Sequence, residues 1–266
     1  MARLVAPLAA CILLPVCAAG MVGNAKWGNA ALASHVVAVV GTNGSVCSGT
    51  VIARDLVLTA AHCVDLGFEF AVFELGDSRL RETDVVRFEQ HPQFDFGASN
   101  MARPTVDLAI LKLAKPLSAR IVPVALGARE FFPAGDKFRV AGVGSVSDAN
   151  DGTFGRLLVA GLTTVPSRSD LQLRLVDPVT RGKRPGVSAC SGDSGGPVFE
   201  DTRSGLVLVG IVSWAATVSG SPGCGGITGA TPIAPVRTWI IETAMLLGSS
   251  IAPAPSVAIL DRPVQR

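Results

Sequence analysis

Short runs of β-branched and other apolar residues, separated by Gly, Pro, Asp, Asn or Ser, constrain the fold of this chain more than any other feature of its sequence. Such runs are typical of strands, and many short strands in one chain favour a sandwich or a barrel. We expect strands at residues 35–40, 51–53, 56–58, 70–75, 108–113, 138–143, 157–162 and 206–212. Helical signals are limited to one turn at 60–64 and a terminal helix at 235–247, which begins at a proline. The sequence therefore predicts an all-β fold with a C-terminal helix.

Length and charge narrow the function. The 266 residues suffice for one or two domains. Only 17% of them are charged and the net charge is +2, which excludes a disordered, highly charged chain. Nucleic-acid binding requires clustered basic surface, so we expect no nucleic-acid partner.

The first 20 residues have the pattern of a secretory signal peptide. Arg3 supplies the positive start, an apolar stretch broken by two prolines follows, and small residues at 18–20 suit a signal peptidase. A membrane anchor needs about 20 apolar residues, more than this run offers. A lipoprotein signal would need a longer apolar run before Cys11 than the chain has. We expect cleavage after Gly20, secretion to the extracellular space or periplasm, and no membrane contact after cleavage.

Four cysteines remain in the mature chain after such cleavage: Cys47, Cys63, Cys190 and Cys224. An even number of cysteines in a secreted chain predicts two disulfides, with three pairings open. A four-cysteine zinc site needs close pairs such as C-x-x-C, and this sequence has none. We expect neither a metal nor a cofactor.

Three local motifs carry the chemistry: TAAHC around His62, DLAIL from Asp107, and GDSGGP around Ser194. Acyl transfer to water needs a nucleophile, a base with a pKa near neutrality, an orienting carboxylate and N–H groups aimed at the oxyanion. Residues 192–196 also fit the G-x-S-x-G elbow of α/β-hydrolases. That fold places its histidine after the serine, whereas the last of the three histidines here is His91. The elbow interpretation is therefore excluded.

In this order and spacing, the three motifs resemble those of chymotrypsin-like serine proteases with the trypsin fold, a similarity that runs from about residue 21 to about residue 246. The resemblance implies two antiparallel six-stranded β-barrels, at 21–123 and at 124–247 with the terminal helix. A loosely ordered tail at 248–266 follows. It also implies the disulfide pairs Cys47–Cys63 and Cys190–Cys224.

The resemblance further implies a role for each motif residue. His62 is the general base, Asp107 orients its imidazole, and Ser194 is the nucleophile. The N–H groups of Gly192 and Ser194 form the oxyanion hole.

Activation is implied by the acid that precedes the nucleophile. In the family a newly formed N-terminal amine pairs with this acid, which is Asp193 here. The segment beginning at Met21 lies at a compatible distance before Cys47 and directly follows the expected cleavage site. We expect signal peptidase itself to produce the activating terminus at Met21. The alternative is cleavage after Ala25 or at a later processing site.

The resemblance also assigns residues to the primary specificity pocket, all of them uncharged. They are Ser188 at its base, Ala189, Ser213, Trp214, Ala215 and, by a less direct alignment, Gly229. An acidic base would favour Arg or Lys in the substrate. We instead expect an apolar or small residue at P1, the substrate residue before the cut bond, with the choice between small and aromatic left open.

The resulting hypothesis is a secreted serine endopeptidase that acts on protein or peptide substrates through an acyl-enzyme. We expect a monomer, with protein protease inhibitors as further partners. The alternative is a non-catalytic homologue that serves in binding or adhesion, although such relatives usually lack a triad member. An esterase or toxin-like enzyme of narrow specificity would share the same chemistry and stays open.

Overall fold

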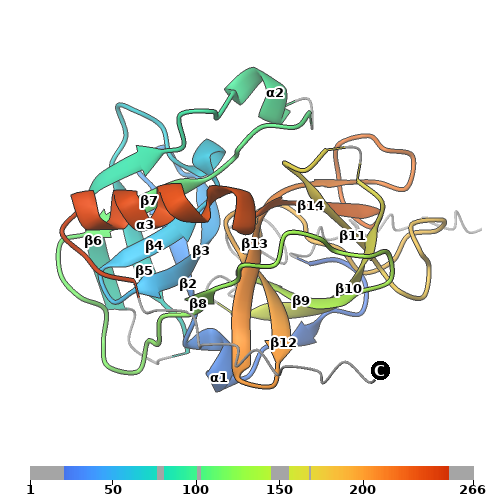
Figure 1. Cartoon of the computed structure of the whole chain (residues 1–266), viewed down its shortest axis with the longest axis horizontal. Helices are drawn as coiled ribbons and strands as arrows, with labels where there is room; N and C mark the ends of the chain where they lie inside the picture. Colours follow the sequence, from blue (N-terminus) through green and yellow to red (C-terminus); the bar gives the residue numbers. More distant parts are fainter. Residues whose placement is uncertain (1–20, 77–80, 101–102, 145–155, 168, 252–266) are drawn as a thin grey trace, which may run out of the picture.

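The computed structural model describes residues 21–76, 81–100, 103–144, 156–167 and 169–251. The expected signal peptide lies outside these residues, as does the expected tail beyond residue 251. The described chain forms two β-barrels side by side, each built from antiparallel strands (Figure 1). The predicted fold class, two six-stranded barrels with a C-terminal helix, is confirmed.

The first barrel closes in the order β2-β3-β4-β7-β6-β5. Its strands are β2 (Val36–Gly41), β3 (Val46–Ala53), β4 (Leu56–Thr59), β5 (Phe70–Glu74), β6 (Arg81–Gln90) and β7 (Ala109–Leu113). Strand β2 is apolar almost throughout because both of its faces are covered. Val37 and Val39 pack with the cluster inside the barrel, whereas Val36 and Ala38 pack with the cluster that reaches the second barrel.

The second barrel closes because β9 pairs with both β10 and β12. Its strands are β9 (Lys137–Gly142), β10 (Leu158–Val165), β11 (Leu173–Val176), β12 (Pro197–Thr202), β13 (Gly205–Ala216) and β14 (Ile227–Pro232). Two short strands join this sheet: β1 (Lys26–Trp27) pairs with β10, and β8 (Ala125–Leu126) pairs with β13. The N-terminal segment is thus attached to the second barrel, although it precedes the first in sequence.

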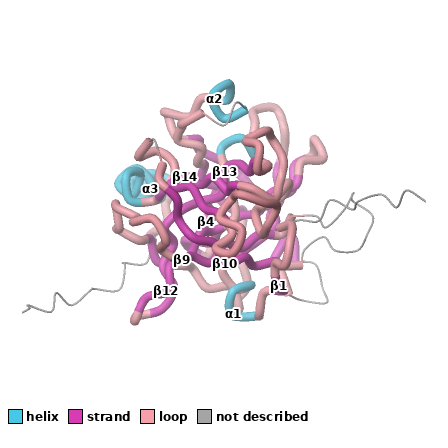
Figure 2. The backbone as a smooth tube through the Cα atoms, turned by 90° about the vertical axis from the view of Figure 1, so that its right-hand side faces the viewer, coloured by secondary structure: helices cyan, strands magenta, loops and turns pink. Residues whose placement is uncertain are grey.

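Helices lie at the periphery of the molecule, around the strands (Figure 2). They are α1 (Ala30–Ala33), α2 (Phe96–Asn100) and α3 (Arg237–Leu246), with 3-10 turns at Ala61–Cys63 and Ala234–Val236. The expected terminal helix is α3 with the 3-10 turn before it, and the expected single turn at 60–64 is the turn that carries His62. Among the described residues, no helix is long and apolar enough to cross a membrane.

Buried apolar side chains form three clusters. One fills the first barrel, a second fills the second barrel, and the third joins both barrels to α3. The joining cluster includes Leu58 and Ile110 of the first barrel, Phe199 and Ile211 of the second, and Ile240 of α3. The barrels are therefore packed against each other by a continuous core, which fixes the position of loops that meet at their seam.

Candidate active site

The three motif residues come from different elements. His62 lies in the 3-10 turn that follows β4, and Asp107 lies two residues before β7. Both belong to the first barrel. Ser194 lies in the loop that leads into β12 of the second barrel. Strand β4 pairs with β7 so that Thr59 is opposite Ala109, which brings the loops carrying His62 and Asp107 to the same barrel end.

His62 and Asp107 form a two-point contact. The Nδ1 atom of His62 lies 2.7 Å from Oδ2 of Asp107, and the backbone N–H of His62 donates to Oδ1 at 3.0 Å. The hydroxyl of Ser213 donates to the same Oδ2 at 2.5 Å. Because Nδ1 faces a carboxylate, the proton of a neutral imidazole is placed on Nδ1 and the lone pair on Nε2.

Asp107 is fully buried, yet its carboxylate is favoured. Burial raises the pKa of Asp107, but the hydrogen bonds and charge of His62 and the hydroxyl of Ser213 outweigh burial and lower the pKa below its ordinary value. The side chain of His62 stays partly accessible, with 24% exposure. The pair therefore holds the imidazole in a fixed orientation with part of the ring open to solvent.

Ser194 is joined to this pair through Ser213. The hydroxyl of Ser194 donates to the carbonyl oxygen of Ser213 at 3.5 Å, and Ser213 in turn contacts Asp107. Within the described part of the chain, no hydrogen bond joins Ser194 to His62. Catalytic hydrogen bonds are often long or absent before substrate binds. The structure thus gathers the three residues around Ser213 with the serine hydroxyl turned toward the β13 backbone.

The loop around Ser194 leaves two N–H groups free. The N–H groups of Gly192 and Ser194 donate to no described residue, whereas those of Asp193, Gly195 and Gly196 all bond to backbone carbonyls. Gly192 has a φ of +87°, a conformation that glycine adopts without strain. Two unengaged donors beside a hydroxyl are suited to bind a developing oxyanion.

Asp193 is fully buried against the N-terminal segment. Its Oδ2 accepts from the N–H of Met21 at 2.9 Å and of Cys190 at 2.8 Å, and its Oδ1 accepts from the N–H of Gly144 at 3.1 Å. Burial raises the pKa of Asp193 to about 6, against the opposing effect of these three donors. The carboxyl therefore lacks a full counter-charge while Met21 is linked to the residue before it.

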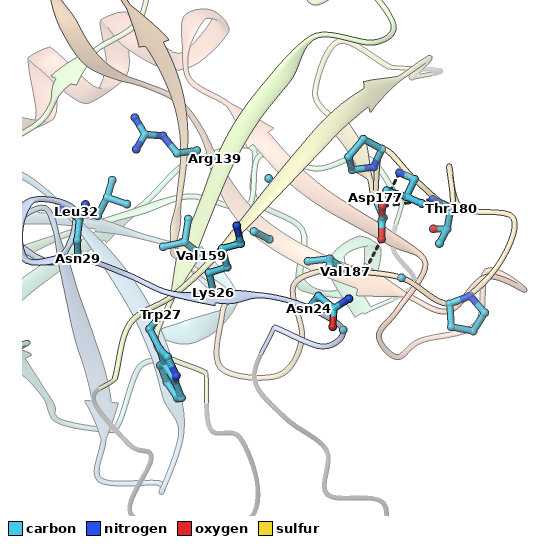
Figure 3. Close-up of a pocket in the computed structure, with 17 residues that line it drawn as sticks. Asn24, Lys26, Trp27, Asn29, Leu32, Arg139, Val159, Asp177, Thr180 and Val187 are labelled. Atoms are coloured by element: carbon cyan, nitrogen blue, oxygen red, sulfur yellow. Dashed lines mark hydrogen bonds between the residues drawn. The ribbon is translucent and has the colours of Figure 1, made fainter.

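The N-terminal segment runs along a cavity of about 820 Å³ that is lined by Gly23, Asn24 and the loop at 177–187 (Figure 3). The carboxylate of Asp177 shapes this loop, because it accepts from the N–H of Val179 at 2.7 Å and of Val187 at 2.9 Å. Gly23 has a φ of +83°, and a Cβ there would lie 3.0 Å from the backbone of the loop. The segment that follows Met21 therefore packs closely against this loop at Gly23.

A smaller cavity of about 150 Å³ opens beside Ser194. Trp214 and Ala215 line it, together with the Cys190–Cys224 disulfide. Its lining carries no charged side chain. Two of the expected pocket residues, Trp214 and Ala215, therefore lie at the cavity next to Ser194.

The other expected pocket residues do not line this cavity directly. Ser188 and Ala189 are fully buried; the Ser188 hydroxyl donates to the carbonyl oxygen of Ala189 and accepts the N–H of Gly225. Ser213 contacts Asp107. Gly229 lies under the indole of Trp214, where a Cβ would approach the ring to 2.1 Å.

Sequence reasoning missed Thr228, which lies next to Gly229 on β14. Thr228 is fully buried, and its Oγ1 accepts the N–H of Ala189 at 2.9 Å. Its position opposite Ala215 in the β13–β14 ladder could have revealed it, but only once the register was known.

Both expected disulfides are present. Cys47–Cys63 joins β3 to the turn that carries His62, and Cys190–Cys224 joins the Ser194 loop to the far wall of the cavity. The sulfurs of Cys47 and Cys63 lie close to the His62 ring. Because the two sulfurs are bonded to each other, this group offers no pair of thiolates to a metal.

Comparison with known proteins agrees with this geometry. The trypsin family model matches residues 26–240. Vitamin K-dependent protein C of Mus musculus is 33% identical over 201 residues, which cover 67% of this chain and 41% of that protein. The protein C of Rattus norvegicus is 32% identical over the same share. The suppressor of tumorigenicity 14 protein homolog of Bos taurus is 31% identical over 200 residues, or 65% of this chain and 22% of that protein.

The chain spans less than half the length of these relatives. Two packed six-stranded barrels, with His, Asp and Ser motifs in that order, define the class of chymotrypsin-like double barrels. The family match makes the assignment narrower: the chain belongs to the trypsin family of serine proteases.

Proposed function

We propose that this protein is a secreted serine endopeptidase in which Ser194, His62 and Asp107 form the catalytic triad. The observation that carries the proposal is that the N–H groups of Gly192 and Ser194, in the loop that carries the serine hydroxyl, donate to no residue that the structure describes. Such donors bind the charge that develops during attack on a carbonyl.

In the proposed mechanism the Ser194 hydroxyl turns from Ser213 toward the Nε2 atom of His62. Its oxygen attacks the substrate carbonyl carbon while Nε2 takes the proton, and Asp107 stabilises the imidazolium. The oxyanion accepts from Gly192 and Ser194. The imidazolium then gives its proton to the leaving amine, which breaks the peptide bond and leaves an ester on Ser194. Water, deprotonated by His62, hydrolyses that ester and restores the hydroxyl.

Substrate binding is proposed along β13. Trp214 and Ala215 pair with β14 on one side, and the pairing of β13 with β12 on the other side ends at Ile211. An extended peptide can add to such a free edge by backbone hydrogen bonds. The P1 side chain would enter the 150 Å³ cavity, which has uncharged walls and the volume of a benzene-sized site. We propose an uncharged P1 preference.

Activation is proposed to follow from cleavage after Gly20. The nitrogen of Met21 already lies 2.9 Å from Asp193, so a free ammonium at this point would supply the missing counter-charge. The domain boundaries at 123 and 247 and secretion through the signal peptide are part of the same proposal. Two disulfides suit an oxidising compartment.

The first experiment is a cleavage-site profile. The secreted protein and its Ser194→Ala variant are incubated with a denatured protein mixture, and new peptide ends are sequenced by mass spectrometry. We expect cuts only with Ser194 present, after uncharged residues. Cuts confined to Arg or Lys would refute the pocket assignment, and an intact mass that begins elsewhere than Met21 would refute the activation step. Absence of Ser194-dependent cuts from a chain that begins at Met21 would favour the binding homologue.

A further inference from the structure

Ser48, on β3 of the first barrel, makes hydrogen bonds that the mechanism above does not use. Its side chain is fully buried at the seam between the barrels. The hydroxyl donates to the carbonyl oxygen of Gly192 at 2.9 Å and accepts the N–H of Val143 at 2.9 Å. Its backbone N–H donates to the carbonyl oxygen of Ser194 at 2.7 Å.

Ser48 therefore holds both residues whose N–H groups face the oxyanion. Gly192 has a positive φ and no side chain, and its own N–H donates to no described residue, so a bond from the other barrel is one of the few restraints on its backbone. The Gly192 carbonyl lies in the peptide plane that joins Gly192 to Asp193, and the Ser48 hydroxyl of the other barrel anchors this plane together with the bond from the Asp193 N–H to the Cys190 carbonyl. Ser48 thereby fixes the backbone directly after the Gly192 N–H. A hydroxyl that both donates and accepts in a buried site has its own rotation fixed as well.

The same strand also positions the base. Cys47 precedes Ser48 and is bonded to Cys63, which follows His62. One dipeptide of β3 is thus linked covalently to the turn that carries the imidazole and by hydrogen bonds to the loop that carries the nucleophile. A small displacement of the imidazole relative to the nucleophile loop would lower the reaction rate, because reacting groups must be held within a fraction of an ångström.

We propose that Ser48 is a positioning residue that holds the oxyanion hole of the second barrel in register with the base of the first. This inference rests on the proposed function. It predicts a defect in stabilisation of the transition state, because the residues that Ser48 anchors through their carbonyls carry the N–H groups that act on charge absent from the bound substrate.

Thr50 provides a matched control on the same strand. Its hydroxyl is also buried, and it donates across the seam to the carbonyl oxygen of Gly195 at 3.2 Å. The N–H of Gly195 bonds to Val212 and does not face the oxyanion. Thr50→Val thus removes a hydrogen bond between the barrels without freeing a residue of the hole.

The experiment compares Ser48→Ala and Thr50→Val with the unaltered protein, using kcat and KM on one peptide and the affinity of a peptide boronate that mimics the tetrahedral state. For Ser48→Ala we expect kcat to fall about 10- to 100-fold, with KM within about twofold and boronate affinity reduced by the same factor as kcat. For Thr50→Val we expect kcat within about threefold.

A second variant guards against misfolding. Ser48→Gly leaves space in which a water can bridge the freed N–H and carbonyl groups, so we expect its kcat to lie between those of the alanine variant and the unaltered protein. If Ser48→Ala does not fold, the glycine variant carries the test, and its losses in kcat and in boronate affinity must match.

Three outcomes overturn the inference. An unchanged kcat in Ser48→Ala would refute it, as would a loss confined to KM or an equal loss in Thr50→Val. If the unaltered protein shows no Ser194-dependent cleavage, the proposed function fails, and the role of Ser48 fails with it. An active protein with an unaffected Ser48→Ala variant refutes the role of Ser48 alone.

Discussion

Releasing the nitrogen of Met21 should change how the stability of the fold depends on pH. We compare a chain that begins at Met21 with a chain extended at its start by Ala19 and Gly20, both carrying Ser194→Ala to prevent self-digestion. In the extended chain Asp193 faces only neutral N–H donors, and in the shorter chain it faces an ammonium group.

The magnitude follows from the pKa of Asp193, which burial raises from 3.8 to about 6. A carboxyl whose pKa is raised by folding stabilises the fold fully below its unfolded pKa, and this contribution is lost as pH rises through its folded pKa. A shift of about two pH units corresponds to about 3 kcal/mol. The extended chain should therefore lose about 3 kcal/mol between pH 4 and pH 7, and the ammonium should prevent this loss in the shorter chain.

The assay is urea unfolding of both chains from pH 4 to pH 10, read as the difference in their free energies of unfolding. We expect this difference to grow by about 3 kcal/mol between pH 4 and pH 7. It should shrink again above about pH 8, where a free α-amine loses its proton. Asp193→Asn in both chains is the control and should abolish the pH dependence. A difference that is constant from pH 4 to pH 7 would refute the pairing of Met21 with Asp193.

Three substitutions test other parts of the site. Ser213→Ala removes the 2.5 Å donor to Asp107, so we expect a loss of about 2 kcal/mol in urea unfolding, and unchanged stability would contradict the contact. Gly229→Ala places a Cβ 2.1 Å from the indole of Trp214, so we expect kcat/KM to fall and tryptophan fluorescence to shift, whereas an unaltered spectrum would contradict the packing. Thr228→Val keeps the shape but leaves a buried N–H without its 2.9 Å acceptor, so we expect thermal unfolding to show a loss of about 1–3 kcal/mol; equal stability would mean that water replaces the hydroxyl.

Much of the fold was predictable because local sequence and burial agree. Strands such as β2 and β7 are apolar on both faces, and their runs stand out against the turn residues around them. Strand β6 was missed because its ten residues carry charges and are largely exposed. Strands of this kind are defined by their partners, which a single sequence does not show.

The candidate site likewise has parts that the sequence predicts and parts that only the fold reveals. The motifs around His62 and Ser194 are short and local, so they stand out in the sequence, and their resemblance to those of chymotrypsin-like proteases gave each residue its expected role. The pocket depends on register: the β13–β14 ladder shifts between Val212 and Trp214 and sets Gly229 opposite Trp214 and Thr228 opposite Ala215, which a single sequence does not show. Ser48 was beyond reach, since its bonds to the nucleophile loop join residues 144 positions apart.

The apolar cluster that spans both barrels and α3 has a consequence for how the chain denatures. Each barrel buries part of its apolar surface against the other. Either barrel alone would therefore expose side chains of this cluster, such as Leu58 or Phe199, to water. The two halves should therefore melt as a single cooperative unit, and an isolated barrel expressed as a fragment should not be a stable domain. A cut in the segment between the barrels would separate the chain without freeing two folded pieces.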